Sequence, residues 1–208
     1  MPKVLKESFD QLYEVADSQS GYFTARQALE TGYSDRMQTY HVQAGDWIRE
    51  WRGIYRLRHY PNPRPDDLMV WYLWSCNREG KPQGVFSHDT ALELLELSTW
   101  TGSRIHMTVP KDFRRSKIPP ALQLHYADLR SFETTFIRQV PITKPIRTML
   151  DLSSEKKIQH HHLIESMQDA RKHGLIAPND LNADWLTDAE KRTLRILDSD
   201  AAQYKAEA

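Results

Sequence analysis

The chain has 208 residues, and its 28 lysines and arginines balance 28 aspartates and glutamates, so the formal net charge is zero. Hydrophobic residues make up 39% of the sequence and aromatic residues 10%, which excludes a wholly disordered chain. No apolar run approaches the roughly 20 residues that span a membrane, and the first residues lack the pattern of a secretory signal. The single cysteine, Cys76, excludes an internal disulfide or a thiolate-cage zinc site. We therefore expect a soluble, cytoplasmic protein of one or two domains.

Residues 1–60 are expected to form three helices followed by a hairpin, which is the plan of a winged helix-turn-helix domain. Apolar residues at helical spacing predict the first helix over residues 9–16. Thr24 stands three residues before a glutamine, which is capping-box spacing for the start of a second helix. Ser34 is suited to begin a third helix and Gly45 to end it.

The third helix is expected to turn Met37, Tyr40 and Ala44 toward the core and its polar residues toward DNA. In a helix-turn-helix motif the N-terminal half of this helix meets base edges in the major groove. We expect DNA contacts from the polar residues of this helix and its start, from the capping residue of the second helix, and from the arginine that follows it. These residues are Thr24, Arg26, Ser34, Asp35, Arg36, Gln38, Thr39 and Gln43. The alternative is an ordinary solvated helix face.

The tryptophan-rich segment 47–58 predicts the hairpin, with Arg52 and Gly53 as its two-residue loop. This register places Arg49 directly opposite Arg56. Because opposed like charges destabilise a sheet, we expect a DNA phosphate to lie between them, and Arg52 to contact DNA as well. A solvated face with splayed arginines is the alternative, and a register slip of one residue would remove the argument.

A proline-rich segment, HYPNPRPDD at residues 59–67, predicts a stiff and extended connector. We therefore expect a DNA-binding domain over residues 1–60, a linker over residues 61–67 and a larger C-terminal domain over residues 68–208. The C-terminal domain is expected to mix helices and strands, so the predicted fold class is α+β.

The second domain contains no GxGxxG, Walker loop, HExxH or GxSxG motif, so we expect no enzyme, no cofactor and no metal. A basic loop offers Lys111, Arg114 and Arg115 as a second set of phosphate contacts, with a solvated loop as the alternative. Asp128 and Glu133 leave open a metal-dependent nuclease that the first domain would target to DNA.

Histidines of the second domain are expected to have structural roles. Ser87, His88 and Asp89 are neighbours at a predicted helix start, where Ser87 is expected to cap the helix rather than to serve a catalytic triad. The three histidines of residues 160–162 cannot all point one way, so we expect a solvated helix start.

Several segments resemble one family in the order that this family shows. The segment GYFTARQALETGYSDRMQTYHVQAGDWIREWRGIYRL resembles the winged-helix domain of AbiEi antitoxins. The segments VFSHDTALELLELS, IHMTVPKDFRR and PITKPIRTMLDLS are similar to later parts of the same family. The resemblance covers roughly residues 8–155.

The resemblance implies an antitoxin of a type IV toxin–antitoxin system, associated with phage defence. Such a protein binds inverted repeats in its own promoter, as two copies on double-stranded DNA, and represses its operon. Its C-terminal domain counteracts a nucleotidyltransferase-like AbiEii toxin without forming a stable complex. Two alternatives stay open besides the nuclease: a stand-alone transcriptional regulator, and a winged helix that binds protein rather than DNA.

Overall fold

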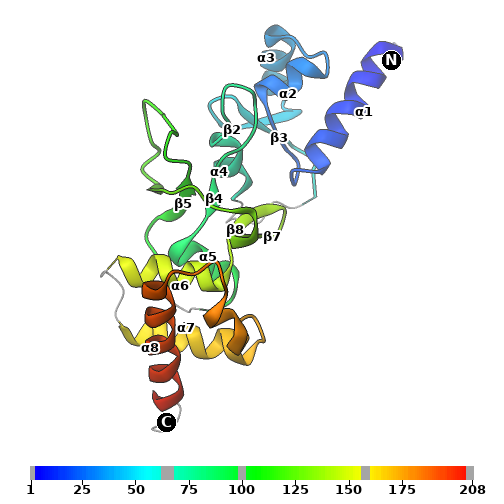
Figure 1. The fold of residues 1–208 in the computed structure, drawn as a ribbon. Helices are drawn as coiled ribbons and strands as arrows, with labels where there is room; N and C mark the ends of the chain where they lie inside the picture. The colour runs from blue at the N-terminus through cyan, green and yellow to red at the C-terminus, as the bar shows by residue number, and fades with distance from the viewer. Residues whose placement is uncertain (1–2, 62–67, 98–101, 156–159, 205–208) are drawn as a thin grey trace. The chain divides into compact units, whose positions relative to one another are not determined.

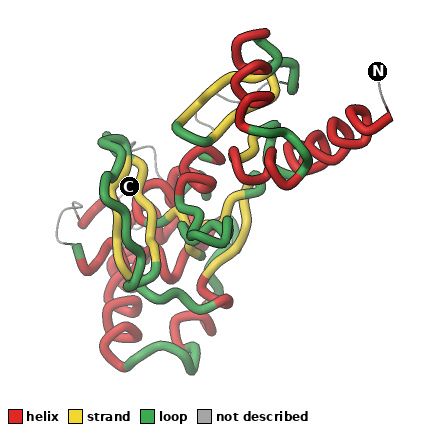
Figure 2. The backbone as a smooth tube through the Cα atoms, turned by 90° about the horizontal axis from the view of Figure 1, so that it is seen from above, coloured by secondary structure: helices red, strands yellow, loops and turns green. Residues whose placement is uncertain are grey.

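The computed structural model describes residues 3–61, 68–97, 102–155 and 160–204, which form an α+β fold (Figure 1). Contacts divide the chain into two compact units. The first is Met1–Gly84 with Arg138–Val140, and the second is Val85–Ile137 with Pro141–Ala208. Strands occur in both units, as the yellow segments of Figure 2 show.

The division between the units differs in place from the proline-rich linker that the sequence predicts. Most of that linker, residues 62–67, lies outside the described residues. The contacts divide the chain after Gly84, because helix α4 (Met69–Trp74) belongs with the first unit. There α4 contacts strands β1 and β3, and the ring of Trp71 meets that of Trp51 at 5.3 Å between centroids.

Three helices and a three-stranded antiparallel sheet make the winged helix-turn-helix part of the first unit. In chain order these elements are α1 (Lys3–Asp17), β1 (Tyr22–Thr24), α2 (Ala25–Glu30), α3 (Asp35–Ala44), β2 (Trp47–Trp51) and β3 (Ile54–Leu57). The strand order is β1-β3-β2. The capping box at Thr24, the N-cap at Ser34 and the left-handed C-cap at Gly45 are all confirmed.

An aromatic core holds α2, α3 and the sheet together. Phe23 of β1 is fully buried and meets Trp47 of β2 edge to face, at 4.8 Å between ring centroids. Tyr33, in the turn before α3, packs on Trp47 at 5.1 Å. Edge-to-face aromatic pairs stabilise a core beyond the area that they bury. The orientation of α3 therefore follows from the aromatic residues of the turn and the hairpin.

The second unit combines a mixed five-stranded sheet with helices. Its elements are β4 (Val85–Phe86), α5 (His88–Leu94), β5 (Ile105–Val109), β6 (Leu122–Tyr126), η1 (Ser131–Glu133), β7 (Thr134–Ile137), β8 (Val140–Thr143), α6 (Pro145–Ser154), α7 (His160–Lys172), η2 (Pro178–Asn182) and α8 (Asp188–Tyr204). The strand order is β6-β5-β4-β8-β7, in which β4 runs antiparallel to β5 and parallel to β8.

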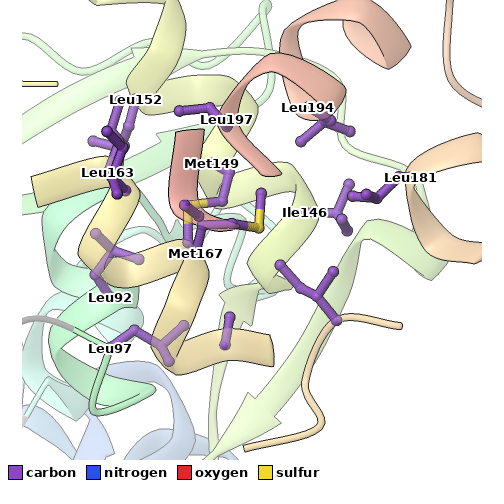
Figure 3. Packing of buried hydrophobic residues seen from close by; sticks show 14 of the residues in the cluster. Leu92, Leu97, Ile146, Met149, Leu152, Leu163, Met167, Leu181, Leu194 and Leu197 are labelled. Atoms are coloured by element: carbon purple, nitrogen blue, oxygen red, sulfur yellow. The ribbon is translucent and has the colours of Figure 1, made fainter. Parts of the chain in front are cut away.

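The helices of this unit share a hydrophobic core (Figure 3). Met149 of α6, Met167 of α7 and Leu194 of α8 are fully buried within it. Burying one such side chain contributes about 2 kcal/mol. None of the helices in the described part of the chain combines the length and apolarity that a membrane span requires.

Candidate nucleic-acid interface

Helix α3 presents a polar face to solvent. Arg36, Thr39, Tyr40 and Gln43 are exposed, and their spacing puts them on neighbouring turns of one face. Tyr40 is 63% exposed, so its predicted place in the core is wrong, and it joins the face from which the sequence prediction omits it. The guanidinium, hydroxyl and amide groups of this face are the types that contact phosphates and base edges.

Two more predicted contacts lie at the start of α3. The hydroxyl of Ser34 accepts a hydrogen bond from the amide of Met37 at 3.4 Å, and Ser34 itself is exposed. Asp35 is also exposed, in the first turn of the helix, where a negative charge interacts favourably with the helix dipole. Both residues thus have a structural role as well as an accessible position.

Gln38 is not part of the exposed face, and its predicted contact with DNA is corrected. It is only 2% exposed, and its Nε2 donates hydrogen bonds to the carbonyls of Ala25 and Tyr33, each at 3.1 Å. The buried side of α3 lies about 100°, or one residue, around the helix from its predicted place. Packing against the turn and the hairpin decides this rotation, so Val42 faces the core and Ala44 the solvent.

We expect Gln38→Ala to destabilise the first unit by about 2 kcal/mol, because it leaves two carbonyls without a buried donor. Chemical denaturation followed by tryptophan fluorescence measures the change. Gln43→Ala, which removes the same side chain from the exposed face, should change stability by less than ~0.5 kcal/mol. Equal effects of the two substitutions would contradict this role for Gln38.

The hairpin of β2 and β3 is the wing of this domain, and its strands pair in a different register from the predicted one. Trp51 pairs with Ile54 as predicted, but a bulge follows, so that Arg49 lies opposite Tyr55 and not opposite Arg56. The predicted phosphate between two opposed arginines is therefore wrong.

Arg56 has its partner within the sheet. Its Nε donates to Glu50 Oε1 at 2.8 Å, its side chain is 13% exposed, and its guanidinium lies 5.9 Å from the ring centroid of Tyr22. The predicted contact of Arg56 with DNA is corrected for this reason. Its charge is neutralised by Glu50 inside the protein.

The start of α2 is also occupied by protein contacts. The amide of Thr24 donates to Gln27 Oε1 at 2.8 Å, and the amide of Ala25 donates to the carbonyl of Gly53 at 2.9 Å. Arg26 donates to Glu30 at 2.8 Å and to the carbonyl of Arg78 at 2.6 Å. Thr24 and Arg26 thus connect parts of the first unit, and we place neither of them in the candidate DNA surface.

Three arginines of the first unit, unlike Arg26 and Arg56, have no partner among the described residues. Arg36 on α3, Arg49 on β2 and Arg52 in the hairpin loop are exposed, and none of them forms a hydrogen bond or ion pair with another described residue. The acids nearest in sequence to the wing, Asp46 and Glu50, bind His41 and Arg56 instead. Three guanidinium groups without an ion pair therefore lie on the helix and the wing, the elements that contact DNA in winged helix-turn-helix proteins.

Comparisons with known proteins agree with this geometry. Residues 10–58 match the family model described as transcriptional regulator, AbiEi antitoxin. This part of the first unit is therefore similar to the regulator domain of AbiEi antitoxins. No curated protein matches the chain. A crystal structure of the RV2827C protein from Mycobacterium tuberculosis aligns with a TM-score of 0.57 and 11% identity, over 96% of this chain and 78% of that one. At this identity the likeness shows the fold alone.

The AbiEi match supports a DNA-binding antitoxin role, and the matched family is described as one of transcriptional regulators. Each of the two acidic residues that a nuclease centre would use lies close to a basic side chain. Asp128 lies 3.8 Å from Lys111 Nζ, and buried Glu133 accepts a hydrogen bond from Arg147 at 2.9 Å. These contacts give both acids structural partners.

The basic loop that follows β5 lies in the second unit, outside the residues that match the AbiEi model. Lys111, Arg114 and Arg115 are all exposed. Arg114 donates to the carbonyl of Lys111 at 2.9 Å, and the Arg115 guanidinium lies 5.8 Å from the ring centroid of Phe113. The loop is thus ordered by its own contacts while its charges face solvent.

Ser87 does not cap the start of α5, which differs from the prediction. Ser87 makes no capping hydrogen bond, and its Oγ instead accepts a hydrogen bond from Thr108 at 2.8 Å and lies 2.9 Å from His88 Nδ1. His88 has a left-handed backbone and is buried. Burial lowers its pKa to about 2, so this imidazole is neutral. Burial, followed by the charge of Glu155, raises the pKa of Asp89 to about 6.

Proposed function

We propose that this protein is a type IV antitoxin that represses its own operon. The AbiEi domain binds inverted repeats in the promoter, one copy of the chain on each half-site, so that two chains associate on DNA. The second unit counteracts a nucleotidyltransferase-like toxin without a stable complex. The family match over residues 10–58 and the unpaired arginines on α3 and the wing support this proposal.

The observation that carries the DNA-binding part is the placement of Arg36, Arg49 and Arg52. They extend from α3 through β2 to the loop of the hairpin, and no acid of the described chain neutralises them. In the proposed complex, Thr39, Tyr40 and Gln43 reach into the major groove while the arginines contact phosphates or guanines.

The basic loop of the second unit is proposed as an auxiliary phosphate contact. Lys111, Arg114 and Arg115 would add sequence-independent affinity, because phosphate contacts position a protein without reading its sequence. Their substitution should therefore weaken binding equally to operator and unrelated DNA.

We expect Arg36→Ala, Arg49→Ala and Arg52→Ala each to weaken binding to the promoter repeats by about five- to tenfold, the loss of roughly 1 kcal/mol per contact. Fluorescence anisotropy with a labelled duplex from the upstream region measures the dissociation constant. The matched control is Arg26→Ala, an exposed arginine of the same unit that is engaged with Glu30 and Arg78. Unchanged affinity in all three variants would contradict the proposed surface.

The antitoxin part has a separate test. Expression of the toxin from the neighbouring gene should arrest growth, and co-expression of the full chain should restore it without co-purification of the two proteins. Failure of rescue alongside intact operator binding would instead favour a stand-alone regulator.

A further inference from the structure

Three imidazoles from separate elements meet inside the second unit. His88 comes from the start of α5, His106 from β5 and His125 from β6. One ring nitrogen of each lies within 4.8 Å of one ring nitrogen of both others. The rings of His88 and His125 stack at 3.6 Å between centroids, and His106 lies at 5.1 Å from His125. These histidines are far apart in sequence, so the fold alone brings them together.

One pair of nitrogens in the cluster already has a spacing close to that of two ligands on one metal ion. His125 Nε2 lies 3.1 Å from His106 Nδ1. Two ligands at about 2.0–2.1 Å from a tetrahedral zinc ion are about 3.4 Å apart, which is close to this distance. The ligand nitrogen of His88 lies within 4.8 Å of these two, and the His88 ring would turn out of its stack with His125 to direct that nitrogen at the same ion.

Each imidazole also faces an oxygen with its outer nitrogen. Ser87 Oγ lies 2.9 Å from His88 Nδ1, and Glu155 Oε1 lies 3.0 Å from His125 Nδ1. Asp89 Oδ2 lies 3.6 Å from His106 Nε2. Metal-binding histidines almost always have such an oxygen partner, because it fixes the tautomer and orients the ring.

Asp89 supplies an independent sign that a cation belongs here. Its side chain is 8% exposed, and its Oδ1 has no hydrogen-bond partner among the described residues. A buried carboxylate oxygen without a partner is unfavourable, and a nearby cation would compensate it. Glu155, 3.7 Å from His88 Nε2, adds a second carboxylate to the border of the cluster.

The backbone of His88 is held in an uncommon conformation. Its φ is +54°, in the left-handed region, which costs a residue with a side chain about 1 kcal/mol or more. Such strain persists where the surroundings impose it, and it clusters at functional sites. Here it directs a buried ring onto the stack with His125.

We propose that His88, His106 and His125 bind one divalent transition-metal ion, with zinc as the preferred ion. Neutral imidazoles are the ligands that zinc, copper and nickel share, and a carboxylate or water completes a four-coordinate zinc site. The ion would join α5, β5 and β6 and thereby stabilise the second unit. None of the three histidines is a proposed DNA contact, so the inference does not depend on the proposed function.

The test measures zinc in the full-length, tag-free protein after equilibration with zinc and desalting. We expect about one zinc per chain in the wild type and a rise in the melting temperature of the second unit. His106→Gln and His125→Gln should each lower zinc affinity at least a hundredfold, and Glu155→Gln about tenfold, as loss of an outer partner does. The histidines of residues 160–162, of which His160 and His161 are exposed, provide the control: their combined substitution by glutamine should leave the tightly bound zinc unchanged.

Cobalt substitution of the wild type keeps the proposal testable where a histidine variant does not fold. A tetrahedral site with nitrogen ligands should give intense visible absorption from bound cobalt, and zinc should displace it. Absence of tightly bound zinc in the wild type, or zinc that disappears only when residues 160–162 are changed, would overturn the proposal. A wild-type cobalt spectrum of the weak octahedral kind would overturn it as well.

Discussion

Arg147→Met should destabilise the second unit by about 3–5 kcal/mol, because it leaves buried carboxylates without their counter-charge. The Arg147 guanidinium donates to Glu133 Oε1 at 2.9 Å and to Asp151 Oδ1 at 2.8 Å. Glu133 is 5% exposed, and Asp151 Oδ2 has no hydrogen-bond partner in the described chain. Chemical denaturation monitored by circular dichroism measures the free energy of unfolding.

The pH dependence of Arg147→Met gives a second readout. Burial already raises the pKa of Asp151, against the opposing effect of Arg147, so the variant should raise the pKa further. A group with a raised pKa in the folded state favours folding at low pH and loses this contribution as pH rises through that pKa. The destabilisation should therefore be larger at about pH 8 than at about pH 5.

Two controls separate charge from packing. Arg104→Met removes an exposed arginine that contacts Gln123, and it should cost less than ~0.5 kcal/mol. Adding Glu133→Gln and Asp151→Asn to Arg147→Met should recover much of the lost stability, because none of the three positions then carries a charge. A loss below ~1 kcal/mol in the single variant would show that these carboxylates are not held by Arg147.

Gly21→Ala should destabilise the first unit by about 3 kcal/mol. Gly21 has a φ of +89°, where a Cβ is unfavourable, and a Cβ built there would lie 2.8 Å from Cβ of Tyr60 and 2.5 Å from its ring. The residue cannot shift easily, because its amide bonds the carbonyl of Ala16 and its carbonyl accepts from Leu57. Tyr60 is itself tied to Asp17 through a 2.9 Å hydrogen bond.

A second glycine of the same unit isolates the effect of the clash. Gly45 has a similar φ of +85°, but a Cβ there would have its nearest contact at 3.7 Å, with the side chain of Arg58. Gly45→Ala should therefore cost only the backbone term of about 1 kcal/mol. If both variants lost the same stability in thermal denaturation, the close packing of Tyr60 on Gly21 would be refuted.

Local features of this fold follow from the sequence alone. The capping box at Thr24 and the caps of α3 at Ser34 and Gly45 depend on residues within a few positions, and they occur as predicted. The hairpin loop is also confirmed, since Trp51 pairs with Ile54. These predictions succeed because hydrogen bonds between near neighbours decide them.

Features that depend on tertiary packing could not be predicted. The rotation of α3, which buries Gln38 and exposes Tyr40, follows from aromatic packing with the hairpin. The bulge shifts the register between Arg49 and Trp51, and the alternation of apolar and polar residues along β2 does not indicate it. The histidine cluster joins residues from α5, β5 and β6, and no local spacing indicates it.

The salt dependence of promoter binding decides whether α3 and the wing form a DNA-binding surface. The dissociation constant for the promoter duplex should be measured over a range of salt concentrations for the wild type and for a variant with Arg36→Ala, Arg49→Ala and Arg52→Ala combined. If all three contact phosphates, the slope of log K against log salt should fall by about three, close to one per arginine. An unchanged slope and affinity in the combined variant, with its folding intact, would contradict the account.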